Sequence, residues 1–270
     1  MASPNNWPSG LNLAGTVFEN GPATLQLDGD VWLSGNVQWL DTIDGDNANA
    51  GTLPNLPVAT FAQAVTNSAA NGIIVIGEGS AETLTGSQAI SLAGLSIFGC
   101  GVGSSRPRYT CAGAVDMWDV GAAGIWIEGI YFPASTAVPT SRVKSNNDSF
   151  VMKDCYFECG ANDTTRALYM FGGNGSRVEG CSFVVTAERP AIGLHVPNAI
   201  NDLTVVGCTF DGGSYGWTDY ALKVAQAALR VRIIDPTMAN HSNIGFTVTG
   251  SSYQLYGVES GGTTRVLLTA

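Results

Sequence analysis

The chain has 270 residues, of which 22 are acidic and 12 are basic, so its formal net charge is −10. An acidic chain of this kind lacks the clustered lysines and arginines that bind phosphate backbones or anionic bilayers, so neither nucleic acid nor a membrane is an expected partner. Only 13% of the residues are charged and 34 are glycine, which favours strands and turns over helices joined by ion pairs. The N-terminus lacks a basic segment followed by an apolar run, so no secretory leader is expected.

Residues 1–38 are predicted to form an extended arm that attaches the protein to a partner, because they contain no repeat. Their only charged residues are Glu19, Asp28 and Asp30, so burial against a partner would cost little desolvation. Their apolar side chains are too many for a freely disordered tail. The alternative is that this segment adds a strand pair to the same subunit. The residues expected to contact a partner are Trp7, Leu11, Leu13, Phe18 and Trp32.

Residues 59–70 are predicted to form a short helix that caps the first coil of a repeat domain spanning residues 39–270. Phe61, Ala64 and Val65 recur at helical spacing, so they would form one apolar face. Thr60 precedes them as a candidate N-cap, with a glutamine three residues further on. A solenoid needs such a cap because each coil buries its apolar face only against its neighbours.

An eight-residue pattern recurs from residue 95 to the C-terminal end of the chain, at spacings of 24 to 30 residues. Repeats of this length with drifting spacing indicate a solenoid. The segments are Leu95–Val102, Ile125–Phe132, Phe150–Phe157, Ser176–Phe183, Leu203–Phe210, Leu229–Pro236 and Tyr253–Ser260.

Positions one, three, six and eight of each segment are mostly apolar, so the alternation expected of a strand slips once between positions three and six. Position five explains the slip, because glycine and aspartate tolerate a left-handed backbone and occupy it in six of the seven segments. These residues are Gly99, Gly129, Asp154, Gly180, Gly207 and Gly257. Each segment is therefore two strands joined by a one-residue corner. The predicted fold is all-β, a single-stranded right-handed parallel β-helix with about 24–30 residues per coil.

Side chains at equivalent positions of successive coils should stack in columns. Position six, which begins with Cys100, should place buried reduced thiols in one column. Position eight should stack phenylalanine rings. Position four should face outward, where Glu128, Lys153 and Glu179 alternate in charge. The thiols of the first column are Cys155, Cys181 and Cys208, and the rings of the second are Phe132, Phe157, Phe183 and Phe210.

Six short motifs follow one another in the first half of the chain: Asp44–Thr52, Leu56–Thr60, Gln63–Val65, Ile73–Ile76, Ala81–Leu84 and Leu95–Pro107. Their order resembles the N-terminal coils of pectate-lyase-like β-helix proteins of tailed-bacteriophage virions. The match covers roughly residues 40–135, and the remainder is similar only as generic coils. In many relatives a histidine precedes the Ala-Glu-Thr motif, and here that place holds Ser80, so any role of that histidine is absent.

The resemblance implies a structural virion component, often trimeric, that decorates the head or forms a spike or tail fibre. We expect a non-enzymatic capsid decoration (cement) protein, because spikes that cleave polysaccharide have longer helices and a dedicated trimerisation domain. Its partners would be the major capsid protein or other virion proteins, in a homotrimer that assembles in the host cytoplasm and ends in the virion. Two alternatives stay open: a tail spike or fibre adhesin that binds host glycan, and a polysaccharide lyase or hydrolase.

Different side chains would mark the two alternatives. An enzyme would need carboxylates that converge on one groove. Asp148, Asp154 and Glu179 come nearest to this, yet they are better explained as turn and surface residues, so no catalytic residue is expected. Neither histidine has a partner at metal-ligand spacing, so no metal or other cofactor is expected. The adhesin would expose aromatic rings on which sugars stack, and the candidates are Tyr215, Trp217 and Tyr220.

Overall fold

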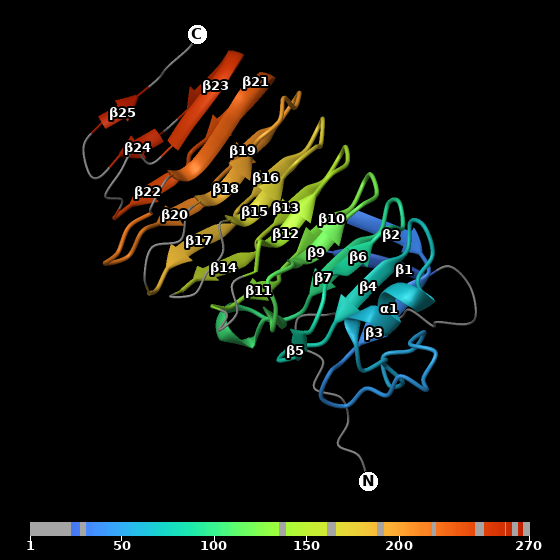
Figure 1. Ribbon diagram of the computed structural model, residues 1–270. Helices are drawn as coiled ribbons and strands as arrows, with labels where there is room; N and C mark the ends of the chain where they lie inside the picture. Colours follow the sequence, from blue (N-terminus) through green and yellow to red (C-terminus); the bar gives the residue numbers. More distant parts are fainter. Residues whose placement is uncertain are drawn as a thin grey trace.

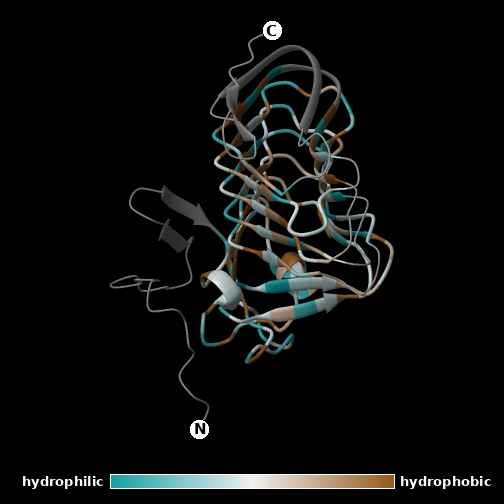
Figure 2. Cartoon of the chain, turned by 90° about the vertical axis from the view of Figure 1, so that its left-hand side faces the viewer, coloured by the Kyte–Doolittle hydropathy of each residue, from teal (hydrophilic) through white to brown (hydrophobic). Residues whose placement is uncertain are grey.

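The computed structural model shows a right-handed parallel β-helix, as the repeat predicts. Strands of successive coils stack along one axis between the two ends of the chain (Figure 1). Hydrophobic and hydrophilic residues alternate along these coils (Figure 2). The structure describes residues 23–27, 31–134, 139–160, 166–187, 192–217, 220–240, 246–256, 258–260 and 264–266, with side chains described within 36–225 and 230–240.

The coils wind through three faces, and the first face holds the first half of each eight-residue segment. Its strands pair in parallel with the strand of the coil below and the coil above. They are β3 (Val37–Leu40), β4 (Ile73–Ile76), β7 (Ser96–Gly99), β10 (Trp126–Glu128), β13 (Val151–Lys153), β16 (Arg177–Glu179), β19 (Thr204–Val206) and the second halves of β21 (Tyr220–Ile234) and β23 (Phe246–Tyr256).

The second face follows the corner and ends in the antiparallel pair formed by β24 and β25. Its strands are β5 (Ala81–Leu84), β8 (Arg108–Cys111), β11 (Tyr131–Phe132), β14 (Tyr156–Cys159), β17 (Ser182–Val185), β20 (Thr209–Asp211), β22 (Thr237–Ala239), β24 (Val258–Ser260) and β25 (Thr264–Val266).

The third face completes each coil, and the long strands β21 and β23 run from this face directly into the first. Its other strands are β6 (Gln88–Ile90), β9 (Asp116–Val120), β12 (Ser141–Ser145), β15 (Arg166–Met170) and β18 (Ile192–Val196).

An antiparallel strand pair precedes the solenoid. Strands β1 (Ala23–Leu27) and β2 (Val31–Gly35) form a two-stranded sheet of their own, so this part of the N-terminal segment contains a strand pair on the same subunit, as the alternative to an extended arm predicted. The solenoid then starts at β3, whose first residue, Val37, pairs with Ile73. The first coil therefore begins two residues before the domain boundary that the sequence suggested.

The corner residues adopt the predicted backbone. Gly129, Gly180 and Gly207 have φ of 75°, 60° and 60°, and Asp154 at the equivalent position has φ of 48°. A left-handed residue reverses the side-chain alternation locally, so the apolar positions on both sides of the corner point inward. The two-strand interpretation is therefore confirmed for the four segments that contain these corners.

A second left-handed corner, which the repeat did not predict, lies immediately before position one. Arg230 is the least expected occupant, because a side chain with a β-carbon strains this conformation. Its guanidinium is held by Asp202 of the coil below, with Nε 2.5 Å from Oδ1 and Nη2 2.6 Å from Oδ2. The column contains Asn71, Gly94, Gly124, Ser149, Gly175, Asp202 and Arg230, with φ between 57° and 72°.

Two details of the predicted register are wrong. In the sixth segment, Val205 pairs with Ile233, which places position one at Val231, two residues after the predicted Leu229. In the first segment, Cys100 does not occupy position six, because residues 100–106 leave the coil as a loop. Pro107 takes that position instead, and its carbonyl accepts the N–H of Tyr131 at 2.9 Å.

The predicted core columns are present. The rings of Phe132, Phe157, Phe183 and Phe210 stack with centroids 4.8, 4.8 and 4.9 Å apart. Cys155, Cys181 and Cys208 are free thiols that are at most 1% exposed. Each donates toward backbone carbonyls of its own coil and the coil below, as Cys181 does to Glu179 at 3.4 Å and Met152 at 3.6 Å.

The predicted capping helix is confirmed as α1 (Phe61–Asn67), shorter than residues 59–70. The Thr60 hydroxyl accepts the N–H of Gln63 at 3.3 Å and so caps its first turn. Phe61 stacks on the core ring of Trp118 with centroids 4.4 Å apart and planes 9° apart. The helix therefore closes the apolar end of the solenoid.

The outward charge ladder is also present on the first face. Lys153 Nζ lies 3.1 Å from Glu128 Oε1 on the neighbouring strand. Glu179 takes its closest partner from its own strand, because Arg177 Nε lies 2.8 Å from its Oε2. These ion pairs are partly exposed on the outer surface of the first face, so they contribute little to stability.

Candidate functional site

The loop formed by residues 100–106, called here the corner loop, creates a pocket on the second face. Most coils turn from the first face to the second through a single residue, as at Gly129. The corner loop instead projects outward and includes a short 3₁₀ turn, Gly103–Ser105. It lies beside the outer surface of β11 and β14, and Val102 within it is 80% exposed.

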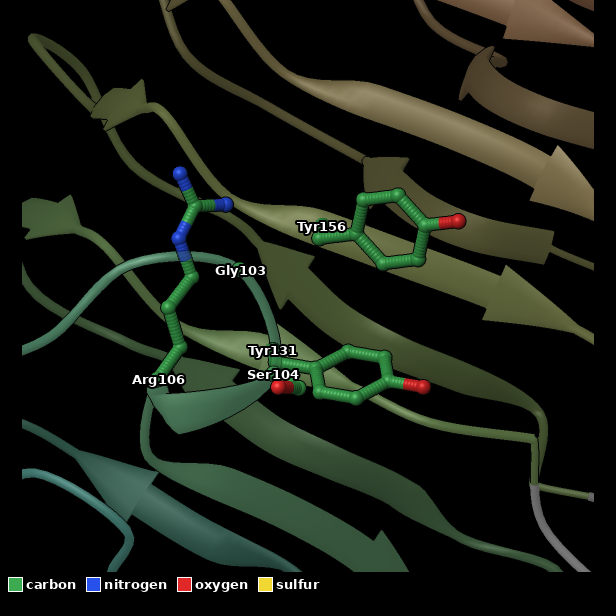
Figure 3. A pocket seen from close by; sticks show the side chains of 5 residues that line it. All are labelled: Gly103, Ser104, Arg106, Tyr131 and Tyr156. Atoms are coloured by element: carbon green, nitrogen blue, oxygen red, sulfur yellow. The ribbon is translucent and has the colours of Figure 1, made fainter.

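The pocket has a volume of about 290 Å³, and Figure 3 shows the residues that line it. Arg106 stands on one side and two tyrosine rings on the other, with both tyrosine hydroxyls pointing away from the arginine (Figure 3). The lining residues are Gly103, Ser104, Arg106, Tyr131 and Tyr156.

The two tyrosines are at position seven of successive segments, so they project outward from neighbouring strands. Tyr131 pairs with Tyr156 across β11 and β14, and their rings meet edge to face with centroids 5.3 Å apart. The Tyr131 hydroxyl donates to the Glu158 carboxylate. Arg108 lies over the Tyr131 ring, 5.6 Å from its centroid, and donates to the Ser104 carbonyl at 2.5 Å. These contacts fix both the ring and the corner loop.

Both phenols are held in their neutral form. Burial raises the pKa of Tyr131, and its hydrogen bond to the charged Glu158 raises that pKa further. Burial is also the first cause that raises the pKa of Tyr156, followed by the charge of Glu158. The pocket therefore offers uncharged aromatic surfaces at any physiological pH.

Arg106 is the charged group of the pocket. Its Nε is buried and has no hydrogen-bond partner among the described residues. No carboxylate in that part of the chain forms an ion pair with its guanidinium, and no acidic residue lines the pocket. Because its guanidinium has no counter-charge among the described residues, this arginine can pair with an anionic group in the pocket.

The aromatic patch predicted for glycan contact does not form as expected. Trp217 is only 1% exposed and belongs to the hydrophobic core, where its ring packs beside Gly193. Tyr215 is 45% exposed, and Tyr220 is half-buried with Lys223 Nζ 5.1 Å from its ring centroid. Trp217 is therefore not a candidate for glycan contact, because its buried ring cannot touch a ligand.

The residues predicted to contact a partner lie mostly outside the described part of the chain. This applies to Trp7, Leu11, Leu13 and Phe18. Trp32 lies on β2, where the strand is described and its side chain is not. The proposed attachment arm thus stays a prediction from the sequence.

The three candidate carboxylates have separate structural contacts. Asp148 Oδ1 accepts the backbone N–H of Asn174 at 2.7 Å and so supports a turn. Asp154 occupies a left-handed corner, and Glu179 pairs with Arg177. Within the described residues, no group of three or more His, Cys, Asp and Glu side chains is suited to hold a metal ion. No helix in that part of the chain is long and apolar enough to span a bilayer.

Comparisons with known proteins found no match: no family model, no curated protein and no solved structure matches the chain.

Proposed function

We propose that the protein is a non-enzymatic structural component of a tailed-bacteriophage virion, a decoration (cement) protein on the outer surface of the capsid. The observation that carries the proposal is the separation of the N-terminal segment from the solenoid. Among the described strands, β1 and β2 pair only with each other, whereas β3 and the strands after it belong to the solenoid sheets. A weakly charged segment outside a self-contained core suits attachment to a partner. The motif order in residues 44–107 supports the virion setting.

The proposed partner is the major capsid protein, and the proposed oligomer is a homotrimer. A parallel β-helix offers long flat faces along its side, and association of three copies would cover one of them. Sedimentation of the purified protein at micromolar concentration should give the mass of a trimer. A stable monomer under these conditions would argue against a preformed trimer.

Deletion of residues 1–35 tests the attachment role. This boundary keeps Asn36, whose carbonyl accepts the N–H of Ile73 at 2.8 Å, so the first coil retains its pairing. We expect the truncated protein to keep its melting temperature and to lose binding to capsids that lack the decoration protein. Normal capsid binding by a well-folded truncation would refute the attachment role. Electron microscopy of intact particles would then locate the full-length protein on the head or the tail.

A second candidate function is that of a spike or fibre adhesin that binds host glycan. The pocket beside the corner loop favours it, because Tyr131 and Tyr156 present aromatic surface next to polar groups. Ligand sites commonly combine apolar walls with a few placed polar groups in this way. Binding of the full-length protein to a glycan array, lost on Tyr156→Ala, would support this function. No comparable observation favours a polysaccharide lyase or hydrolase.

A further inference from the structure

We infer that the pocket beside the corner loop binds a sugar that carries a carboxylate, such as a uronic acid unit of a longer glycan. The inference rests on the second proposed function and deepens it by naming the class of glycan. It is carried by the juxtaposition of two fixed tyrosine rings with Arg106, an arginine that forms no ion pair among the described residues.

The tyrosine wall provides the surface for a sugar ring. Tyr131 and Tyr156 meet edge to face, with ring centroids 5.3 Å apart and planes 77° apart, so a sugar ring can lie on the face of one tyrosine and contact the other. Glu158 and Arg108 already engage Tyr131, so this ring does not need to be ordered when a ligand arrives. A fixed aromatic surface costs little conformational entropy on binding, and the C–H groups of a pyranose pack against it.

The arginine wall provides the charge. A guanidinium presents its N–H donors in a planar fork that matches the two oxygens of a carboxylate. Arg106 forms no ion pair within the described part of the chain, in contrast to Arg177 and Arg230, which pair with Glu179 and Asp202. A carboxylate in the pocket would pair with the guanidinium through its terminal nitrogens and neutralise its charge.

The arrangement of the two walls orients the ligand. The guanidinium and the tyrosine rings face the pocket from opposite sides (Figure 3), and Ser104 lies on the corner loop between them. A volume of about 290 Å³ is at the lower end of ligand sites, so it suits one sugar ring of a chain that continues into solvent. A bare inorganic anion would contact the arginine and leave the tyrosine wall unused.

Calorimetric titration of the full-length protein tests the inference with paired probes. The probes are tetrasaccharides of galacturonate and of glucuronate, each beside the same oligosaccharide with its carboxyl groups reduced to alcohols. We expect at least one acid to bind about tenfold more tightly than its reduced partner, because the charge-assisted pair with Arg106 is lost on reduction. Inorganic phosphate at the same concentration should compete weakly, since it cannot use the aromatic wall.

Variants assign the binding to the pocket. Arg106→Gln should remove the preference for the acid over the reduced probe, whereas Tyr156→Ala should weaken both probes to a similar extent. Arg232→Gln is the matched control, because Arg232 is exposed on β21, where it belongs to the first face. It should bind like the unchanged protein. Thermal melting confirms that each variant is folded.

Two results would overturn the inference in different ways. Equal binding of acid and reduced probes, lost on Tyr156→Ala and retained on Arg106→Gln, would leave a glycan adhesin that prefers neutral sugars. Absence of binding to every probe, or binding that neither variant changes, would remove the pocket as a glycan site and the adhesin function with it. Full competition by inorganic phosphate would indicate a simple anion site.

Discussion

Three corner glycines share a left-handed backbone and differ in what a side chain would meet, so alanine substitutions should separate strain from crowding. A β-carbon on Gly207 would have no atom within 4 Å. On Gly180 it would lie 2.3 Å from a carboxylate oxygen of Asp154, the end of a flexible side chain. On Gly129 it would lie 2.6 Å from the carbonyl oxygen of Gly99, which is fixed in strand β7.

The expected losses of unfolding free energy follow from these distances. Gly207→Ala should cost about 1–2 kcal/mol, the strain of an L-residue in the left-handed region. Gly180→Ala should cost less than about 1 kcal/mol beyond this strain, because the Asp154 side chain can turn away. That movement gives up only its surface ion pair with Lys153, whose Nζ lies 3.8 Å from Asp154 Oδ2. Gly129→Ala should add about 1–3 kcal/mol of overpacking, because the Gly99 carbonyl cannot move without shifting its strand.

Equilibrium unfolding in urea, followed by far-ultraviolet circular dichroism and by tryptophan fluorescence, measures the three losses. The slope of unfolding free energy against urea concentration should be the same for all variants if only stability changes. Unfolding curves that coincide for the two probes would justify a two-state treatment. Gly86→Ala is the control, because Gly86 has no neighbour within 4 Å of a β-carbon and no left-handed φ. A loss at Gly129 no greater than at Gly207 would refute the crowding argument. A loss at Gly207 equal to that at Gly86 would refute the strain argument.

Three further predictions concern the core and the pocket. Phe183→Ala removes the ring between two stacked neighbours and should cost about 3–5 kcal/mol, measured by the same urea unfolding; a loss below about 1 kcal/mol would contradict the ring column. Thiol labelling of the folded protein should be slow at the buried column of Cys155, Cys181 and Cys208, and rapid labelling there would contradict the register. Tyr131 and Tyr156 have a raised pKa when folded, so the stability they contribute is present below about pH 10, the pKa of tyrosine in an unfolded chain. It should be lost as the pH rises through the folded pKa, and Tyr131→Phe should reduce this alkaline loss in urea unfolding at successive pH values; an unchanged loss would contradict the raised pKa.

The repeat revealed the fold because its corners are chemically marked. Glycine at position five correctly identifies Gly129, Gly180 and Gly207 as left-handed, whereas Gly99 at the same position is not left-handed. The two core columns follow from the same alignment. The corner before position one carries no such mark. Its occupants include Ser149, Asp202 and Arg230 beside the glycines, so composition gives no common signal.

The error in the sixth segment has a physical cause. A shift by two residues keeps every strand side chain on the same face, so hydrophobic alternation cannot detect it. Leu229 and Val231 are both apolar, and only the backbone distinguishes them. The left-handed Arg230 and Asp235, with φ of 57° and 46°, mark the two corners and fix the register.

The pocket could not be predicted for a different reason. Tyr131 and Tyr156 occupy the same outward position in successive segments, and this pairing is readable from the sequence. The corner loop is not, because Gly99-Cys100-Gly101 imitates the one-residue corner of the later coils. For Trp217 the sequence predicted a surface residue that the structure buries. Its neighbours Tyr215 and Tyr220 suggest a surface patch, although the Trp217 ring fills the core beside Gly193.

The corner loop shows that the scaffold separates variation from folding. Strand β7 pairs with β10 before the excursion, and β8 pairs with β5 and β11 after it, so a detour of residues 100–106 leaves the ladder intact on both sides. Loops of other lengths and compositions could therefore be exchanged at this corner while the coils keep their register. Natural divergence or deliberate grafting of a loop at one such corner would alter what the molecule recognises. The neighbouring corners of the stack are further sites where loops could be inserted independently.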